Sequence, residues 1–219
     1  LTIKALLFDF DGTLANSSPG IIASLKYALK KNGVGANVTE EKINNSIGPP
    51  LVPFIERVLD GNADENMMKA IAISYREHYT EKGLFMAELY DGVEKALNYL
   101  HEKYMLFVVS SKPEVFLRKL MVALNIGQYF KNIYGPGLEL APLKKAELVK
   151  ACMAENNLKT YECIMIGDKA EDVAAAAANG IKSLGALYGF GTAEELQIAG
   201  ASFLIESPHD FIKMDYDRV

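Results

Sequence analysis

The stretch "ALLFDFDGTLANSS", residues 5–18, joins an apolar run to a group of polar residues. It begins with a short apolar run at residues 5–8, which has the length and composition of a buried strand. Two aspartates, Asp9 and Asp11, follow directly, and a Gly-Thr pair typical of a turn comes next. Ligands of open α/β sheets bind beyond the carboxyl ends of the strands, so this strand is expected to hold two carboxylates rigidly at such an edge.

Two later apolar runs, at residues 104–110 and 162–168, end in polar side chains in the same way. The first run ends in Ser110, followed by Ser111 and Lys112; the second ends in Asp168, with Asp172 four residues further on. Taken alone, an aspartate in such a position is most often a helix N-cap. Because parallel strands end at one edge of a sheet, these groups are instead expected to converge on a single polar pocket.

Four carboxylates in one pocket, those of Asp9, Asp11, Asp168 and Asp172, repel one another and require a cation. Oxygen ligands without a cluster of His or Cys favour Mg²⁺, a hard ion that takes one or two carboxylates and keeps several waters. The three histidines are scattered and match no catalytic triad or His-rich metal site. The sequence therefore predicts a magnesium site at this pocket.

Apolar runs that alternate with helical patterns predict an α/β fold with a doubly wound parallel sheet. The expected strands are residues 3–9, 104–110, 132–134, 162–168, 181–187 and 202–205, and a last helix is expected from Pro208. Residues 15–86 interrupt this alternation with a helical pattern, which predicts a small inserted helical cap domain. Residues 1–14 and 87–219 then form the α/β core; the alternative is an unusually long crossover connection.

The composition excludes several classes of function. Half of the 219 residues are apolar, which is enough for a sizeable core, but no run is long enough to span a membrane. A net charge of −5 disfavours a nucleic-acid partner. No export signal precedes the first strand, and Cys152 and Cys163 are expected as buried, reduced thiols, so a cytoplasmic protein is predicted.

Four motifs together resemble those of the haloacid dehalogenase superfamily. They are "DFDGTL" (9–14), "VVSSK" (108–112), "LKKAEL" (143–148) and "IGDKAED" (166–172), in the order and with the spacing of that superfamily. The segment "IGPPL" (47–51) and the tail at residues 185–208 resemble the branch of phosphoglycolate phosphatase and β-phosphoglucomutase. The tail includes Tyr188 to Gly191, which is expected at the rim of the site.

The resemblance implies a role for each matching residue. Asp9 is implied as the nucleophile that forms an aspartyl-phosphate, and Asp11 as the general acid and base. Ser110 would hydrogen-bond a phosphoryl oxygen. A lysine would neutralise charge on the nucleophile and the phosphoryl group; Lys145 is the first candidate and its neighbour Lys144 the second.

The remaining implied contacts concern the metal, the phosphate and the cap. Mg²⁺ would be held by Asp9, Asp168 and the backbone carbonyl of Asp11, with Asp172 as a ligand or as a group that fixes the metal's waters. Phosphate and substrate contacts are expected from Phe10, Gly12, Ser111, Lys112 and Asn16. Asn16 stands where many relatives have Asp, and "LKK" replaces the commoner Lys-Pro form, which leaves the choice of lysine open.

The resemblance implies a Mg²⁺-dependent phosphatase that hydrolyses a small, phosphoglycolate-like phosphorylated metabolite. The second aspartate, Asp11, favours phosphoryl transfer over dehalogenation, because displacement of chloride needs no acid for the leaving group. The alternatives are a β-phosphoglucomutase-like phosphomutase, a pyrophosphatase or nucleotidase on the same site, and a module that only binds a phosphorylated ligand. The expected partner is a small metabolite, without nucleic acid or membrane, and the expected assembly is a monomer or homodimer.

Overall fold

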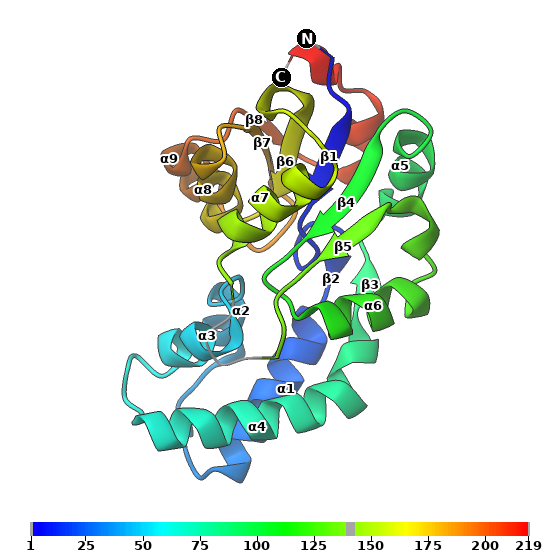
Figure 1. The fold of residues 1–219 in the computed structure, drawn as a ribbon. Coiled ribbons are helices and arrows are strands. Elements are labelled where there is room, and N and C mark those ends of the chain that lie inside the picture. Colours follow the sequence, from blue (N-terminus) through cyan, green and yellow to red (C-terminus); the bar gives the residue numbers. More distant parts are fainter. Residues whose placement is uncertain (1, 139–142, 219) are drawn as a thin grey trace.

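The computed structural model describes residues 2–138 and 143–218, and its centre is a six-stranded sheet in the order β5-β4-β1-β6-β7-β8 (Figure 1). All neighbouring strands in this sheet are parallel. The strands are β1 (Ala5–Phe8), β4 (Met105–Val109), β5 (Asn132–Tyr134), β6 (Cys163–Gly167), β7 (Lys182–Ala186) and β8 (Phe203–Ile205). The predicted α/β class and parallel sheet are confirmed, and each strand lies within two residues of its expected bounds.

The register of the three central strands aligns their carboxyl ends. Phe8 of β1 pairs with Val108 of β4 on one side and with Ile166 of β6 on the other. The residues that follow these strands therefore emerge side by side at one edge of the sheet. This register is what brings distant parts of the sequence to one site.

Alternate side chains of β1 pack against helices on opposite faces of the sheet. Leu6 and Phe8 belong to the larger apolar cluster, which includes residues of α5 (Val93–Leu100) and α6 (Glu114–Ala123). Ala5 and Leu7 belong to the other cluster, with residues of α7 (Lys145–Glu155) and α8 (Ala170–Ala178). Burial on both faces explains why the central strands are apolar throughout. Helix α9 (Ala193–Ala199) packs against α8.

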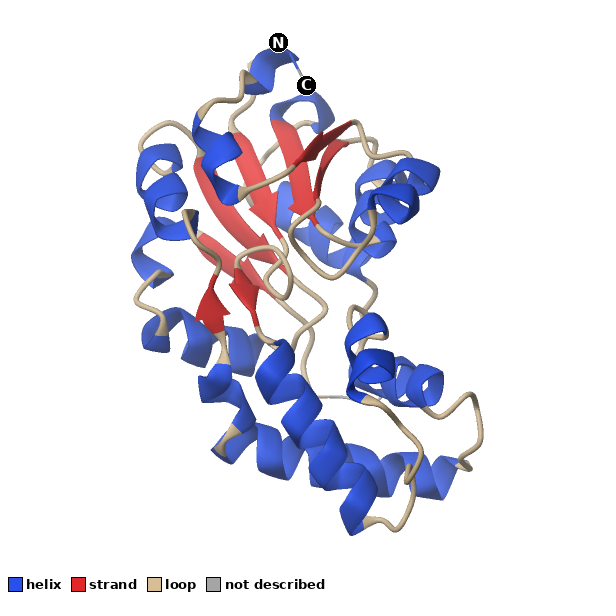
Figure 2. Cartoon of the chain, turned by 180° about the vertical axis from the view of Figure 1, so that it is seen from behind, coloured by secondary structure: helices blue, strands red, loops and turns tan. Residues whose placement is uncertain are grey.

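The segment between β1 and α5 is helical and lies beyond one end of the sheet (Figure 2). Its elements are α1 (Ser18–Lys31), α2 (Glu40–Asn45), α3 (Leu51–Val58), α4 (Glu65–Glu81) and the 3₁₀ segment Gly83–Met86. Helix α1 packs against α4 and the 3₁₀ segment, where a Cβ on Gly20 would lie 1.9 Å from the Gly83 carbonyl oxygen. The two glycines thus allow the backbones to touch at the base of this helical region.

Two details differ from the sequence-based expectations. The helical region begins and ends in a two-stranded antiparallel ladder, β2 (Ala15–Asn16) with β3 (Glu88–Leu89), which the sequence does not signal because two-residue strands carry no pattern. The last helix, expected from Pro208, is a 3₁₀ segment that ends at Ile212, with Asp210 accepting from the Ser207 N–H. Among the described residues, no helix combines the length and apolarity needed to cross a membrane.

Candidate active site

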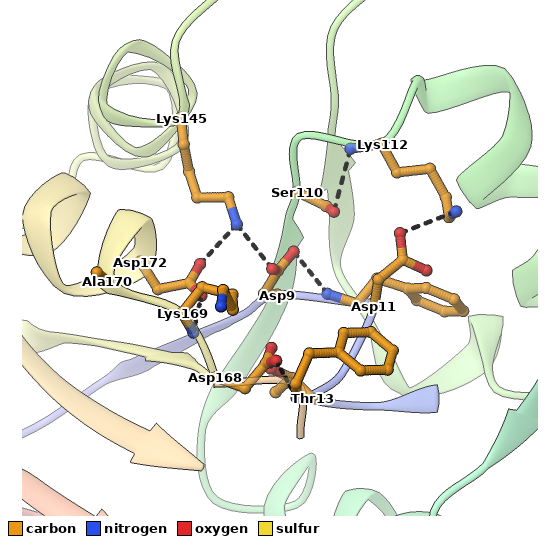
Figure 3. A network of polar contacts seen from close by, with 12 residues as sticks. Asp9, Asp11, Thr13, Ser110, Lys112, Lys145, Asp168, Lys169, Ala170 and Asp172 are labelled. Carbon is orange, nitrogen blue, oxygen red and sulfur yellow. Dashed lines mark hydrogen bonds and ion pairs between the residues drawn. The ribbon is translucent and has the colours of Figure 1, made fainter. Parts of the chain in front are cut away.

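Lys145 joins two of the expected carboxylates at the edge of the sheet. Its ammonium donates to Asp9 Oδ2 at 2.7 Å and to Asp172 Oδ1 at 2.5 Å, and all three side chains are buried (Figure 3). Burial opposes the charge of Lys145, but the carboxylates of Asp172 and Asp9 outweigh it and hold the lysine pKa above its ordinary value. Lys144 is exposed at the start of α7, so Lys145 is the one of the two candidate lysines that contacts these carboxylates.

Three acidic side chains form a compact buried cluster. Carboxylate oxygens of Asp9, Asp168 and Asp172 lie within 4.8 Å of one another. Burial raises the pKa of Asp168 well above its usual range, and the nearby charges of Asp172 and Asp9 raise it further. Burial also raises the pKa of Asp172, against the opposing effect of Lys145. Such crowding of hard oxygen donors is the environment that a divalent cation relieves.

Asp168 is held by a tight shell of neighbours. The Thr13 hydroxyl donates to its Oδ1 at 3.0 Å, and the Phe190 N–H donates to its Oδ2 at 2.8 Å. A Cβ on Gly12, whose φ is +84°, would lie 2.1 Å from Asp168 Oδ2, so only glycine permits this approach. The Tyr188 hydroxyl donates to the Thr13 carbonyl at 2.9 Å, which shows how the tail segment fixes this part of the site.

Asp11 stands apart from the acidic cluster found among the described residues and makes its own contacts. Its Oδ2 accepts from the Lys112 ammonium at 2.8 Å, and its Oδ1 accepts a short hydrogen bond from the Ser17 hydroxyl. Lys112 also donates to the Tyr79 hydroxyl at 2.7 Å. Burial opposes the charge on Lys112, but Asp11 and Tyr79 raise its pKa above the ordinary value. The sequence gives no signal for Ser17 or Tyr79 at this place.

The other expected phosphate contacts divide into two groups. Ser110 and Ser111 follow the carboxyl end of β4 and line the pocket together with Asp9. The N–H groups of Phe10 and Gly12 have partners within the turn: Phe10 donates to Asp9 Oδ1 at 2.8 Å, and Gly12 donates to the Ala15 carbonyl at 2.9 Å. The tight turn after β1 uses these donors internally, because it folds back on itself within a few residues.

Asn16 is likewise used locally. Its Oδ1 accepts from the Ser18 N–H at 3.1 Å and from the Ser18 hydroxyl at 2.7 Å. The described lining of the pocket does not include it. In this structure Asn16 therefore bonds the start of α1, in keeping with the tendency of Asn to bond its own neighbouring backbone, and its contact with substrate stays a prediction.

The pocket lies between the sheet edge and the helical region. The empty space in it, counted together with the open solvent at its mouth, is about 870 Å³. Asp9, Asp11, Ser110, Ser111 and Lys112 form its polar end. Residues 15–86 contribute walls that are almost entirely apolar, with Arg76 as their one charged side chain in the described lining. These wall residues are Ile21, Ile47, Gly48, Pro49, Pro50, Leu51, Val52, Phe54, Tyr75, Arg76 and Tyr79.

Further contacts connect the helical region to the sheet side of the pocket. The Nη2 atom of Arg57 in α3 lies 3.7 Å from the Oε1 atom of Glu171 at the start of α8. A Cβ on Gly48 would lie 3.3 Å from the Cγ atom of Lys169, whose ammonium is held by Glu195 at 2.9 Å. Together with the bond between Tyr79 and Lys112, these contacts show the helical region seated against the site.

Comparison with known proteins supports the resemblance seen in the motifs. The model of the family described as haloacid dehalogenase-like hydrolase matches residues 6–186. A 5'-nucleotidase of Pseudomonas aeruginosa is 33% identical over 88% of this chain and 86% of its own length. A phosphoglycolate phosphatase of Colwellia psychrerythraea is 29% identical over 95% of both chains.

A solved structure agrees over nearly the whole chain. It is described as a predicted phosphatase from Clostridium acetobutylicum, and it matches with a TM-score of 0.91 and 34% identity over 97% of this chain and 98% of its own. The family expected from the four motifs is thus confirmed. This chain belongs to the haloacid dehalogenase-like hydrolase family, and its relatives include phosphoglycolate phosphatases.

Proposed function

We propose that this protein is a Mg²⁺-dependent phosphatase that hydrolyses a small phosphorylated metabolite through an aspartyl-phosphate on Asp9. The observation that carries the proposal is the placement of Asp9. Its carboxylate is bonded to the buried ammonium of Lys145, belongs to the acidic cluster and lines the pocket next to Ser110. A nucleophile, a fixed cation and a hydroxyl donor at one point are what phosphoryl transfer requires.

The residues divide the reaction into two steps. An oxygen of Asp9 attacks phosphorus, the bond from phosphorus to the ester oxygen breaks, and Asp11 delivers a proton to the departing oxygen. Water then attacks the phosphorus of the aspartyl-phosphate, Asp11 takes a proton from that water, and the bond from phosphorus to Asp9 breaks. Lys145 stabilises the negative charge throughout, and Ser110 donates to a phosphoryl oxygen.

The acidic cluster fits the expected metal. Asp9 and Asp168 offer buried carboxylate oxygens, and Asp172, whose oxygens accept from Lys145 and from the Lys169 N–H, is suited to fixing the metal's waters. When bound, Mg²⁺ would offset the crowded negative charge and that of the phosphoryl group. We further propose that residues 15–86 act as a cap that covers the pocket and excludes bulk water.

The cap walls suggest two substrate classes. Arg76 in an otherwise apolar wall suits a second anionic group, such as the carboxylate of phosphoglycolate. The broad apolar remainder of the wall, with Phe54 and Tyr75, suits the sugar and base of a nucleoside monophosphate, in keeping with the 5'-nucleotidase relative. We place a phosphoglycolate-like substrate first, because the partly buried Arg76 supplies a charge that the carboxylate of such a substrate can pair with.

Replacing Arg76 with glutamine is expected to lower kcat/KM for 2-phosphoglycolate by about tenfold or more, since a charge-assisted hydrogen bond to a carboxylate is lost. Ethyl phosphate, which lacks the carboxylate, should be hydrolysed equally by both proteins. Steady-state phosphate release with Mg²⁺ measures this. Equal losses on the two esters would show that Arg76 does not select the second anion, and a preference of the wild-type protein for nucleoside monophosphates would favour the second class.

The general activity is tested on a panel of phosphoglycolate, nucleoside monophosphates, hexose phosphates and pyrophosphate, with Mg²⁺ and with a chelator in its place. We expect release of phosphate only with the metal present. Transfer of the phosphoryl group between positions of a hexose phosphate, without release, would instead support the mutase. No turnover of any compound by folded protein with Mg²⁺ would contradict the proposed function.

A further inference from the structure

Both carboxylate oxygens of Asp11 are held by groups connected to the helical region. Ser17, which donates to Oδ1, is the residue before α1. Lys112, which bonds Oδ2, follows β4 in the core, but its ammonium is itself held by the Tyr79 hydroxyl of α4. These contacts therefore connect the start of α1, at Ser17, to α4, at Tyr79. They run through the carboxylate of Asp11, which the proposed mechanism uses as acid and base.

Ser17 occupies a position that usually serves another purpose. It is the N-cap residue of α1, where a serine hydroxyl normally accepts from a backbone N–H of the first helical turn. Here the side chain makes no capping hydrogen bond, and its hydroxyl donates to Asp11 instead. The residue is only 1% exposed, so this orientation is fixed inside the protein.

Tyr79 is fixed with similar rigidity. Its side chain is 2% exposed, stacks on Tyr75 with ring centroids 5.4 Å apart, and meets the edge of Phe116 in α6 at 5.4 Å. The ring packing holds the hydroxyl beside Lys112, which is 8% exposed. In such a poorly hydrated place an ammonium depends strongly on its few partners, because water does not replace a lost one.

We propose that Tyr79 is a positioning residue for Asp11. The Tyr79 hydroxyl holds the Lys112 ammonium in place. Lys112 and Ser17 together hold the carboxylate of Asp11. The acid is therefore aligned only when α4 is packed against the loop after β4. The inference rests on the proposed phosphatase function, because it assigns to Asp11 the protonation of the leaving group.

The test is the dependence of kcat/KM on the leaving group in Tyr79→Phe. This change keeps the ring packing and removes only the hydroxyl. The two substrates are p-nitrophenyl phosphate, whose leaving group departs without a proton, and p-methylphenyl phosphate, whose leaving group needs one. General acid catalysis supplies about 10²–10⁴-fold, so misalignment is expected to cost about tenfold on the p-methylphenyl ester. On the p-nitrophenyl ester the change should be less than about twofold.

Ser17→Ala is the second variant, and it should show the same selective loss, because it frees the other oxygen of Asp11. The control is Tyr27→Phe, which removes the hydroxyl of an exposed tyrosine elsewhere in the helical region and should leave the hydrolysis of both esters unchanged. Equal losses on the two esters in Tyr79→Phe, or no loss on either, would overturn the inference. Failure of the wild-type protein to hydrolyse either ester would overturn the proposed function, and this inference with it.

Discussion

An Asp9→Asn protein is expected to release phosphate at least about 10³-fold more slowly than the wild-type protein, because the amide oxygen does not attack phosphorus. The substitution keeps the shape of the side chain. It also removes one of the charges that crowd Asp168, so the fold should survive the change. Phosphate release with Mg²⁺ and an excess of substrate measures the loss.

A matched structural control accompanies this measurement. Thermal unfolding of Asp9→Asn, followed by circular dichroism in the presence of chelator, should give a midpoint close to that of the wild-type protein or above it. A folded variant that retains a tenth or more of the wild-type rate would show that another group attacks phosphorus.

Replacing Lys145 with methionine is expected to lower both stability and activity. The methionine leaves the buried carboxylates of Asp9 and Asp172 without their cation, and loss of one partner of a buried ion pair costs about 3–5 kcal/mol in the free energy of unfolding. Activity should fall by about 10²-fold or more, because the charge on the transferring group loses its stabilisation. Urea unfolding in chelator and phosphate release with Mg²⁺ measure the two effects.

The neighbouring lysine supplies the control for this prediction. Lys144 is exposed, and its backbone N–H, not its ammonium, bonds Glu147 at 2.8 Å. Lys144→Met should therefore have the same free energy of unfolding and the same rate of phosphate release as the wild-type protein. If the two methionine variants behaved alike, the buried bridge between Asp9 and Asp172 would have no energetic role.

The part of the site that could be predicted from the sequence is the part that lies at the carboxyl ends of the strands. Asp9, Ser110 and Asp168 each follow an apolar run, and the parallel register brings such ends together whatever lies between them. The choice between Lys144 and Lys145 depends on the phase of α7 relative to the sheet, and adjacent residues on a helix point in different directions. Sequence alone therefore left that choice open.

The contact between Tyr79 and Lys112 could not be predicted, because it joins segments far apart in the chain through single atoms. Tyr75 and Tyr79 are spaced like ordinary buried residues of an amphipathic helix, so nothing marks the Tyr79 hydroxyl as the partner of Lys112. Asn16 and Gly12 also make local hydrogen bonds that the motif comparison does not indicate. The Asn16 side chain accepts from Ser18, and the Gly12 N–H donates to the Ala15 carbonyl.

Passage of the phosphoryl group through Asp9 can be observed in an Asp11→Asn protein. With p-nitrophenyl phosphate and Mg²⁺ the first step needs no acid, whereas hydrolysis of the intermediate lacks its base, so the aspartyl-phosphate should accumulate. Acid quenching followed by peptide mass analysis should find one phosphoryl group on Asp9 for each p-nitrophenolate released in the first turnover. Release of p-nitrophenolate without any phosphorylated peptide, or with the phosphoryl group on another residue, would show that Asp9 is not the nucleophile.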